Sequence, residues 1–477
     1  MKFCYLSNNR NIFISRRLIK IMVYKSINLA EFFSKYKHFL GYTSLQRSLI
    51  TVVHELLTNA LDACEESNIL PDIELRVEQI SNDTYRVVCR DNAAGIIKEE
   101  VPNIFGVLLY TSKFFEKKQT RGQQGIGVSG SILYAQSTTG EPAKVITKRK
   151  GDDRAYLFII RINIKKNKPE VLEKKKIEWD QEHGTEVELI VKGRMTERLN
   201  EYIRRTALVH PYARIKYNGK VYERKTNSFT TPVALPVFPS DLDFTEFRDF
   251  LLSESNYSTI ASKIYHSFKG IGWIRSKEAE KIVGKRYIED LTEEDIKKIY
   301  LYFKELKPKI SRDLVEKSVC LFGKETVEYY LKQFNPEKIF YASSKPEIWK
   351  SDVYAVEVGV AYNTAINDVH RFANKIPLMY QQGACVMTKV INEMNWKQYK
   401  FRRNAVFLVH VVSTSVPYTA QSKEAVADVE IIRQKIKSCL QSIGRQIRSY
   451  ETYKENEERI LRIRKLKDEI KEVLKDV

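Results

Sequence analysis

The stretch HELLTNALDAC, residues 54–64, decides how the N-terminal part of this chain folds. Apolar residues surround its polar letters, as expected of a helix that is buried on most of its circumference. Glu55, Asn59 and Asp62 nevertheless follow one another at i, i+4 and i+7, so they share one helical face. Buried polar groups need partners. Those partners are either other side chains of the protein or a ligand with cations, since carboxylate and amide oxygens suit Mg²⁺.

The composition indicates a multidomain protein with a polyanionic partner. The chain has 477 residues, enough for about two to four domains. Eighty Lys and Arg against 60 Asp and Glu give a formal net charge of +20. Such a charge favours nucleic acid over a membrane surface as the partner, with a generally lysine-rich proteome as the plain alternative.

Cysteine usage and hydropathy indicate a protein of the reducing cytosol. The six cysteines are dispersed without a CxxC pair, so we expect neither a zinc site nor a disulfide framework. No apolar run reaches the roughly 18 residues of a membrane span, so we expect no transmembrane segment. Residues 1–21 are basic and lack acidic residues, loosely like a transit segment, although a start at Met22 explains them equally well.

Hydrophobic periodicity divides the chain into segments of different character. A helix over 44–67 precedes alternating runs that predict strands, and residues 226–241 read as a linker. Short helices follow over 240–312, with Ser276 or Thr292 as a start and Gly284 as a stop. Further on we expect a helix at 386–395 between two strands, and one long helix from Lys423 onward. The predicted strands are 72–80, 84–92, 143–150, 154–163, 184–193, 354–363 and 405–414.

Two more motifs carry candidate chemistry. DNAAGI, residues 91–96, stands at a strand end, where its Asp either accepts a hydrogen bond from an amine or caps a turn. RGQQGIGVSG, residues 121–130, has glycines that free the backbone to wrap a phosphate, and the helix behind it points its positive end at the anion. The stretch is neither GxxxxGK[ST] nor the GxSxG nucleophile elbow.

Taken together, the three motifs resemble the Bergerat-type nucleotide fold (GHKL class) of gyrase-class topoisomerases, ninety-kilodalton chaperones, sensor histidine kinases and MutL repair proteins. Glu55 and Asn59 match the E-x-x-x-N box, 91–96 matches D-x-G-x-G in part, and 122–127 matches the lid glycines. Longer runs resemble the family of DNA topoisomerase VI B subunits more closely, and the likeness covers most of residues 24–450. These runs are 54–74, 112–143, 371–399 and 416–432.

The resemblance implies an α/β (α+β) multidomain fold. A Bergerat-type ATPase sandwich would be followed by a helix–two-turns–helix insert and by a ribosomal-protein-like βαβ transducer with a long C-terminal helix. The implied divisions are an uncertain extension at 1–23, the ATPase domain at 24–232 with an N-terminal strap at 24–42, the insert at 233–312, the transducer at 313–450 and a stalk helix at 451–477.

The resemblance also assigns roles to individual residues. Glu55 would be the general base that deprotonates the water attacking the γ-phosphate of ATP, and Asn59 the Mg²⁺ ligand. Asp91 would accept from the adenine amino group, in a motif that retains Gly95. Lys423 would reach from the transducer to the γ-phosphate as a point cation. The remaining ATP contacts implied are Ser112, Lys113, Gly122, Gln123, Gln124, Gly125, Ile126, Gly127, Val128 and Ser129.

Two departures from the family pattern concern the fine geometry of the site. Ala93 stands where the family has Gly, which costs about 1–2 kcal/mol if that position needs a positive φ and nothing otherwise. Gln421 and Ser422 precede Lys423 where a glycine is expected.

The function implied is that of the ATP-hydrolysing subunit of a type II DNA topoisomerase. Two copies would dimerise on ATP binding, with residues 24–42 swapping across the interface, and pass one duplex through a break made by a separate A subunit. The assembly would be an A2B2 heterotetramer that relaxes supercoils and decatenates, and it would hold double-stranded DNA without sequence preference. The resemblance implies a cytoplasmic, nucleoid-associated protein of archaeal type.

Three alternatives stand beside this interpretation. A MutL-like repair clamp would use the same ATPase fold, but the runs around Arg371 and Lys423 argue against it. A topoisomerase-like scaffold that has lost ATP use disagrees with the retained Glu55 and Asn59. A sensor kinase would need a phospho-acceptor histidine in a dimerisation helix, and none of the seven histidines lies in a recognisable helix of that kind.

Overall fold

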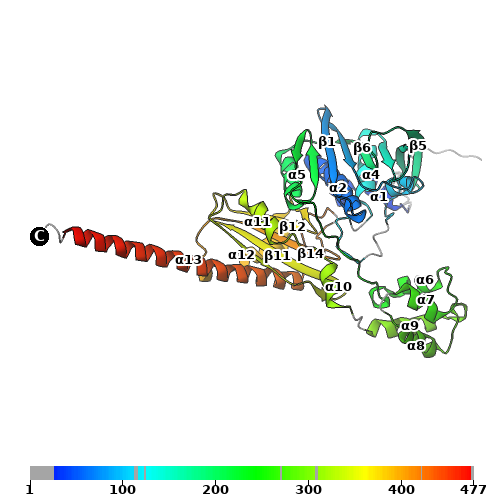
Figure 1. Ribbon diagram of the computed structural model, residues 1–477. Coiled ribbons are helices and arrows are strands. Elements are labelled where there is room, and N and C mark those ends of the chain that lie inside the picture. Colours follow the sequence, from blue (N-terminus) through cyan, green and yellow to red (C-terminus); the bar gives the residue numbers. More distant parts are fainter. Residues whose placement is uncertain are drawn as a thin grey trace, which may run out of the picture.

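The computed structural model describes residues 26–111, 117–122, 125–268, 271–306, 310–420 and 422–473, without the side chains of 472 and 473. Figure 1 shows two sheet-containing parts, a small helical part set apart from them, and one long helix that runs far beyond the second sheet. The extension expected at residues 1–23 lies outside this range. None of the helices within it combines the length and the apolar character that a membrane span requires.

The described residues form an eight-stranded sheet in the N-terminal half, in the order β5-β4-β3-β6-β2-β1-β7-β8. Helices α2 (Leu45–Glu66) and α4 (Gly127–Thr139) contact each other and strand β6, so they cover the same face of this sheet. Its strands are β1 (Asp72–Ser81), β2 (Thr84–Asp91), β3 (Ala143–Lys148), β4 (Ala155–Asn163), β5 (Lys168–Ile177), β6 (Gly184–Lys192), β7 (Arg214–Tyr217) and β8 (Lys220–Tyr222).

Helix α2 forms as its sequence predicts. The side chain of Ser44 caps its first turn by accepting from the backbone N–H of Arg47, and the apolar positions of the helix are buried against the sheet. The helix ends at Glu66, before Pro71. Smaller helices complete this part: α1 (Leu29–Lys35), a 3₁₀ turn at Lys37–Leu40, α3 (Val101–Gly106) and α5 (Glu197–Val209).

Four short helices with a core of their own follow: α6 (Phe244–Leu252), α7 (Ile260–Ser267), α8 (Trp273–Val283) and α9 (Glu293–Glu305). Thr292 caps α9 in a capping box with Asp295, and Gly284 ends α8 with a left-handed φ of 67°, as expected. Ser276 does not start a helix. It lies inside α8 with its hydroxyl donating to the carbonyl of Gly272, so that prediction was wrong.

The described C-terminal half contains a six-stranded sheet in the order β10-β11-β14-β12-β13, with β9 paired to β11. Strands β12 and β14 are parallel and are joined through helix α12, which makes a βαβ unit. Its first strand is not the predicted 354–363, because that strand, β11, runs antiparallel to β14, and β12 was not predicted. The elements are α10 (Arg312–Lys317), α11 (Lys324–Lys332), β9 (Lys338–Ser343), β10 (Glu347–Trp349), β11 (Asp352–Tyr362), β12 (Asp368–Ala373), β13 (Ile376–Pro377), α12 (Val386–Glu393) and β14 (Ala405–Ser413).

The long helix α13 runs from Glu430 to Val473 and crosses the expected boundary at residue 451 without interruption. Its first half packs Ile436 and Ile443 on the second sheet, whereas its second half leaves that sheet (Figure 1). The predicted long helix is confirmed, but it begins at Glu430, so its predicted start at Lys423 was wrong. Lys423 has a left-handed φ of 51°, which a right-handed helix does not accommodate, and it belongs to the loop between β14 and α13.

Candidate functional site

A cavity of about 640 Å³ opens between α2, α4 and the loop before α13. This volume lies within the range of ordinary small-molecule sites. Side chains and backbone from both halves of the chain meet in its wall, among them Glu55, Asn59, Cys89, Val187, Gly127 and Lys423.

Glu55 projects from α2 toward the N-terminus of α4. A Cβ atom placed on Gly127 would lie 2.0 Å from Oε2 of Glu55, so only glycine lets this carboxylate come so close to the helix end. Ile126, the N-cap residue of α4, has no side chain that could cap the first turn. The positive end of the helix dipole therefore faces the carboxylate and the cavity, where it would favour a bound anion.

Asn59 lies one turn further along α2 and also lines the cavity. Its Oδ1 is 3.5 Å from a Cβ atom placed on Gly122, and within the described ranges no group hydrogen-bonds to its amide. The amide oxygen and the nearby carboxylate of Glu55 are hard donors. Mg²⁺ in nucleotide sites is held by one or two such groups together with phosphates and waters, so the residues present fit that ion.

Asp91 ends strand β2, opposite Thr185 of β6. Its Oδ1 accepts from the backbone N–H groups of Ala93 (2.9 Å) and Thr185 (3.1 Å). Burial raises the pKa of Asp91 to about 7, although these two hydrogen bonds act in the opposite direction. Cys89 and Ile96 on either side of it line the cavity, while Asp91 is buried and is not itself one of the lining residues.

The turn after Asp91 needs one glycine but not two. Gly95 has a φ of +74°, and a Cβ atom placed on it would lie 2.1 Å from the carbonyl oxygen of Lys148, so no other residue fits there. Ala93 is not among the residues with positive φ. The alanine in place of the family's glycine therefore causes no backbone strain.

The glycine-rich loop meets the cavity over most of its described length. Gly122, Gly125, Ile126, Gly127 and Val128 line it, whereas the buried Ser129 does not and its hydroxyl donates to the carbonyl of Ile126 (3.3 Å). The expected contacts Ser112, Lys113, Gln123 and Gln124, and the departure at Gln421, lie outside the described residues.

Lys423 reaches the site from the loop that follows the second sheet. Its Nζ donates to the carbonyl oxygen of Arg121 at 3.1 Å and lies 4.0 Å from Oε1 of Glu55. The neighbouring Ser422 packs against Gly41, whose φ of +91° ends the N-terminal 3₁₀ turn. Segments near residues 41, 121 and 423 therefore meet beside the predicted general base.

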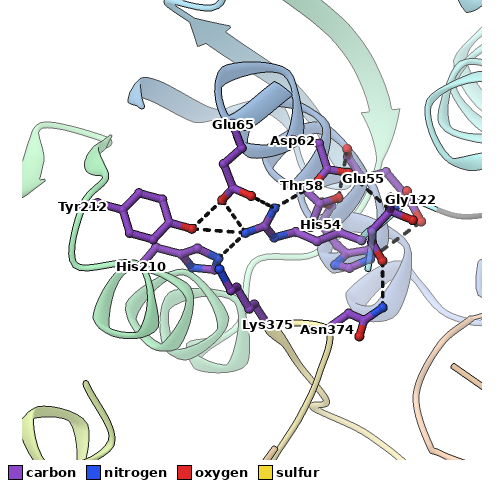
Figure 2. A network of polar contacts seen from close by, with 12 residues as sticks. His54, Glu55, Thr58, Asp62, Glu65, Gly122, His210, Tyr212, Asn374 and Lys375 are labelled. Carbon is purple, nitrogen blue, oxygen red and sulfur yellow. Dashed lines mark hydrogen bonds and ion pairs between the residues drawn. The ribbon is translucent and has the colours of Figure 1, made fainter. Parts of the chain in front are cut away.

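The polar face of α2 is divided between cavity and protein. Glu55 and Asn59 face the cavity, but Asp62 does not depend on a ligand, because its Oδ1 accepts from Nη1 of Arg121 at 2.6 Å. Arg121 also bonds to Glu65 and His210, so that Asp62 belongs to a buried network with these two residues (Figure 2). Of the two kinds of partner that the sequence left open for this face, Asp62 has the first, because its partner is another side chain.

Charges in this network shift each other's pKa. Burial alone would raise the pKa of Glu65, but the cations Arg121 and Lys375 lower it to about 2. Burial, together with Arg121, lowers the pKa of His210 to about 3. Its Nδ1 donates to the carbonyl of Thr206, which leaves the lone pair on Nε2 to accept from Arg121.

Two residues of the site were missed in the sequence. Tyr42 lines the cavity, with its ring stacked 4.3 Å from that of Tyr134 and its hydroxyl 3.0 Å from that of Ser131. Nothing in its local sequence signals this position. Arg121 opens the glycine-rich motif, and the acidic pair that it meets on α2 lies too far along the chain to signal its role.

Comparisons with known proteins identify families that match both halves of the chain. The family described as histidine kinase-, DNA gyrase B-, and HSP90-like ATPase matches residues 44–192, and the family described as topoisomerase VI B subunit, transducer, matches residues 316–462. The first range contains Glu55, Asn59 and the glycine-rich loop, and the second contains Lys423.

Curated relatives match over nearly the whole chain, and each is named as the B subunit of type 2 DNA topoisomerase 6. The protein of Methanococcoides burtonii is 37% identical, over 89% of this chain and 72% of its own. That of Archaeoglobus fulgidus is 36% identical, over 90% and 74%, and that of Saccharolobus solfataricus 32%, over 91% and 86%. This chain therefore belongs to the family of topoisomerase VI B subunits and carries the ATPase domain of a type II DNA topoisomerase.

Proposed function

We propose that the chain binds ATP with Mg²⁺ in the 640 Å³ cavity and hydrolyses it to open and close a gate for DNA. The observation that carries this proposal is the convergence of Glu55, Asn59, the N-terminus of α4 and Lys423 on one cavity. A base, a hard-metal ligand and two sources of positive charge are the parts that phosphoryl transfer to water requires.

Glu55 takes the proton of the attacking water. Its carboxylate lies beside the N-terminus of α4 and 4.0 Å from the ammonium of Lys423, where it can accept that proton. The same helix end and Lys423 stabilise the charge that develops on the γ-phosphate oxygens. Mg²⁺, when held by Asn59 and the phosphates, supplies further neutralisation of that charge.

Asp91 selects the base. Backbone amides occupy Oδ1, so the other oxygen is left to accept from an exocyclic amino group. Adenine offers that donor where guanine has a carbonyl oxygen, which would repel the carboxylate. We therefore expect ATP to be preferred over GTP, with Ser112, Lys113, Gln123 and Gln124 as additional contacts around the phosphates.

The proposed domains are 24–232, 233–312, 313–450 and 451–477. They are supported by separate cores for the first sheet, the helices α6–α9 and the second sheet. The last division is functional rather than structural, since it separates the sheet-packed half of α13 from the half that extends away (Figure 1).

Two such chains close on each other when ATP is bound. The strap at 24–42 exposes Tyr36 and Phe39, aromatic side chains that a second copy would cover. A separate A subunit makes the double-strand break in an A2B2 assembly, and the projecting end of α13 reaches toward it. The net charge of +20 suits DNA held through its phosphates. The match of 316–462 to the topoisomerase VI transducer disfavours a MutL-like clamp.

Strand passage tests this function. The full chain, purified with its A subunit, should decatenate interlinked DNA circles in the presence of ATP and Mg²⁺, and should stop after one round with a non-hydrolysable analogue. Decatenation at the same rate without nucleotide would contradict the proposal. On its own, the chain should shift from monomer to dimer when the analogue is added, as measured by crosslinking and mass, and an unchanged mass would contradict the gate.

A further inference from the structure

Arg121 is fixed on several sides at the root of the glycine-rich loop. Its side chain is 5% exposed, and the guanidinium donates to Asp62 at 2.6 Å and to both oxygens of Glu65 at 2.6 and 3.0 Å. Nη2 also donates to Nε2 of His210 at 2.8 Å and lies 3.4 Å from the hydroxyl of Tyr212, which itself donates to Glu65 (Figure 2). A guanidinium held in this way has no freedom to rotate.

The peptide groups around Arg121 are held as well. Asn374, at the turn between β12 and β13, donates from Nδ2 to the carbonyl of Thr120 at 3.0 Å. The backbone N–H of Gly122 donates to Oδ2 of Asp62 at 3.4 Å. The carbonyl group of Arg121 between them therefore has a defined direction, set from α2 on one side and from the second sheet on the other.

That carbonyl oxygen is the acceptor for Lys423. The Nζ–O distance is 3.1 Å, and the same Nζ lies 4.0 Å from Oε1 of Glu55. Lys423 is 8% exposed and has a φ of 51°, a left-handed conformation that is unfavourable for a non-glycine residue and therefore persists only when contacts hold it.

We propose that Arg121 is a positioning residue of the ATPase site: clamped by Asp62 and Glu65, it directs the carbonyl oxygen that holds Lys423 beside Glu55. The side chain of Arg121 is not part of the cavity wall, so it acts on the reaction only through its backbone and through Lys423. That Arg121 holds Lys423 through its carbonyl oxygen is argued from the contacts alone, while the effect of this contact on hydrolysis rests on the proposed function.

The first test measures how fast the side chain of Lys423 is acetylated in the absence of nucleotide. The full-length chain is treated briefly with acetic anhydride, and the acetylation rate of each lysine is read by mass spectrometry. Arg121→Lys keeps the charge but loses the planar fork, so Lys423 should react about 10-fold faster than in the wild type. Lys435, which is 9% exposed and bonded to Glu347, is the control and should not change. An unchanged acetylation rate at Lys423, or an equal rise in the rate at Lys435, would overturn the proposal.

The second test measures turnover. Arg121→Lys should lower kcat about 10-fold or more and leave the Kd of a non-hydrolysable ATP analogue within about 3-fold, because a misplaced Lys423 affects the transition state more than binding. Arg214→Lys, at a surface pair with Asp72, is the matched control with unchanged kcat. If Lys423 is acetylated faster in Arg121→Lys than in the wild type but kcat is normal, the positioning role is overturned. A wild-type chain that hydrolyses no ATP would instead contradict the proposed function, while the acetylation result still decides whether Arg121 holds Lys423.

A milder variant guards against loss of folding. Glu65→Gln keeps the shape of the side chain and leaves Asp62 as the carboxylate paired with Arg121, so the clamp weakens but is not lost. Lys423 should then acetylate about 3-fold faster, with a smaller fall in kcat than in Arg121→Lys. The same rate as the wild type at Lys423 would contradict the proposal even if Arg121→Lys does not fold.

Discussion

Asp91 combines a buried position with a proposed role that requires its charge. Burial raises its pKa from the usual 3.8 to about 7, so the folded chain binds this proton more tightly than the unfolded chain does. Between pH 4 and 7 the folded state consequently loses stability as the pH rises. The ionised carboxylate, which is the stronger acceptor for an amino group, is populated mainly above that range.

Nucleotide affinity should therefore depend on pH through Asp91. We expect the Kd of an ATP analogue to fall as the pH rises from 6 to 8, by about 3- to 10-fold, as measured by calorimetry. Asp91→Asn should bind more weakly and remove this dependence, and it should also flatten the decline of thermal stability over the same interval. An undiminished pH dependence in Asp91→Asn would show that another group is responsible.

Gly127 and Gly140 at the two ends of α4 allow a matched comparison. A Cβ atom at Gly127 would displace the carboxylate of Glu55, whereas one at Gly140 would meet nothing within 4 Å. The backbone of Gly140 has a φ of +79°, which is unfavourable for any other residue. Gly127→Ala should lower kcat about 100-fold with little loss of stability. Gly140→Ala should cost about 1 kcal/mol of stability and leave kcat unchanged. Steady-state kinetics and thermal unfolding of both variants distinguish the two effects, and the reverse pattern would refute this role of Gly127 beside Glu55.

At the scale of the helix, the two halves of α13 differ in how they are packed. Ile443 is completely buried against the second sheet, whereas Leu461 is 55% exposed on the projecting half. We expect Ile443→Ala to lower the free energy of unfolding by about 2–5 kcal/mol, and Leu461→Ala to change it by less than about 0.5 kcal/mol. Denaturant unfolding of the full chain measures both, and equal losses would mean that the second half is packed in the isolated chain as well.

The elements that the sequence predicted well are those with a clear period and one buried face. Strands β1 and β2 alternate, and α2 has both a capping serine and an apolar stripe. Strand β5 was missed because, as an edge strand of the first sheet, it is exposed along nearly its whole length and rich in Lys and Glu. Such a strand carries no hydrophobic period to read.

The site could be predicted only where its residues lie close to one another in the sequence. Glu55 and Asn59 share one helix, and the glycine loop is continuous, so spacing and family resemblance indicated them. The partner of Asp62 is Arg121, 59 positions along the chain, and no short-range pattern connects the two. The apolar 3–4 spacing that predicts a helix begins only at Val429, and the left-handed φ of Lys423 depends on contacts with a distant segment.

At the scale of the whole molecule, the segment 117–122 before the glycine-rich loop connects the first sheet with the helices α6–α9 and with the second sheet. Lys117 pairs with Leu235 of the segment leading to α6 and bonds to Asp241, and the backbone N–H of Gln119 donates to the carbonyl of Ser318. Asn374 of the second sheet reaches Thr120. These contacts connect the proposed nucleotide site with the segment before α6 and with the second sheet, the parts that would surround DNA in the proposed function.

DNA binding should be governed by charge. With a net charge of +20, the full chain should bind duplexes of unrelated sequence with affinities within about 3-fold of each other. The affinity should fall at least about 10-fold between 50 and 200 mM salt, because phosphate contacts release counterions. Fluorescence anisotropy measures both, and salt-independent or strongly sequence-dependent binding would contradict this expectation.

The most direct test of the proposed mechanism compares ATP binding and hydrolysis in the full chain and in Glu55→Gln, with Glu74→Gln on strand β1 as a control for the loss of a carboxylate. Glu55 faces the cavity beside the N-terminus of α4, whereas Glu74 pairs with Lys216 of β7 at 3.0 Å. We predict that Glu55→Gln binds ATP within about 3-fold of the wild type and loses at least about 100-fold in kcat, while Glu74→Gln behaves as the wild type. Full turnover by Glu55→Gln would contradict the central claim that this face of α2 serves a magnesium-bound triphosphate.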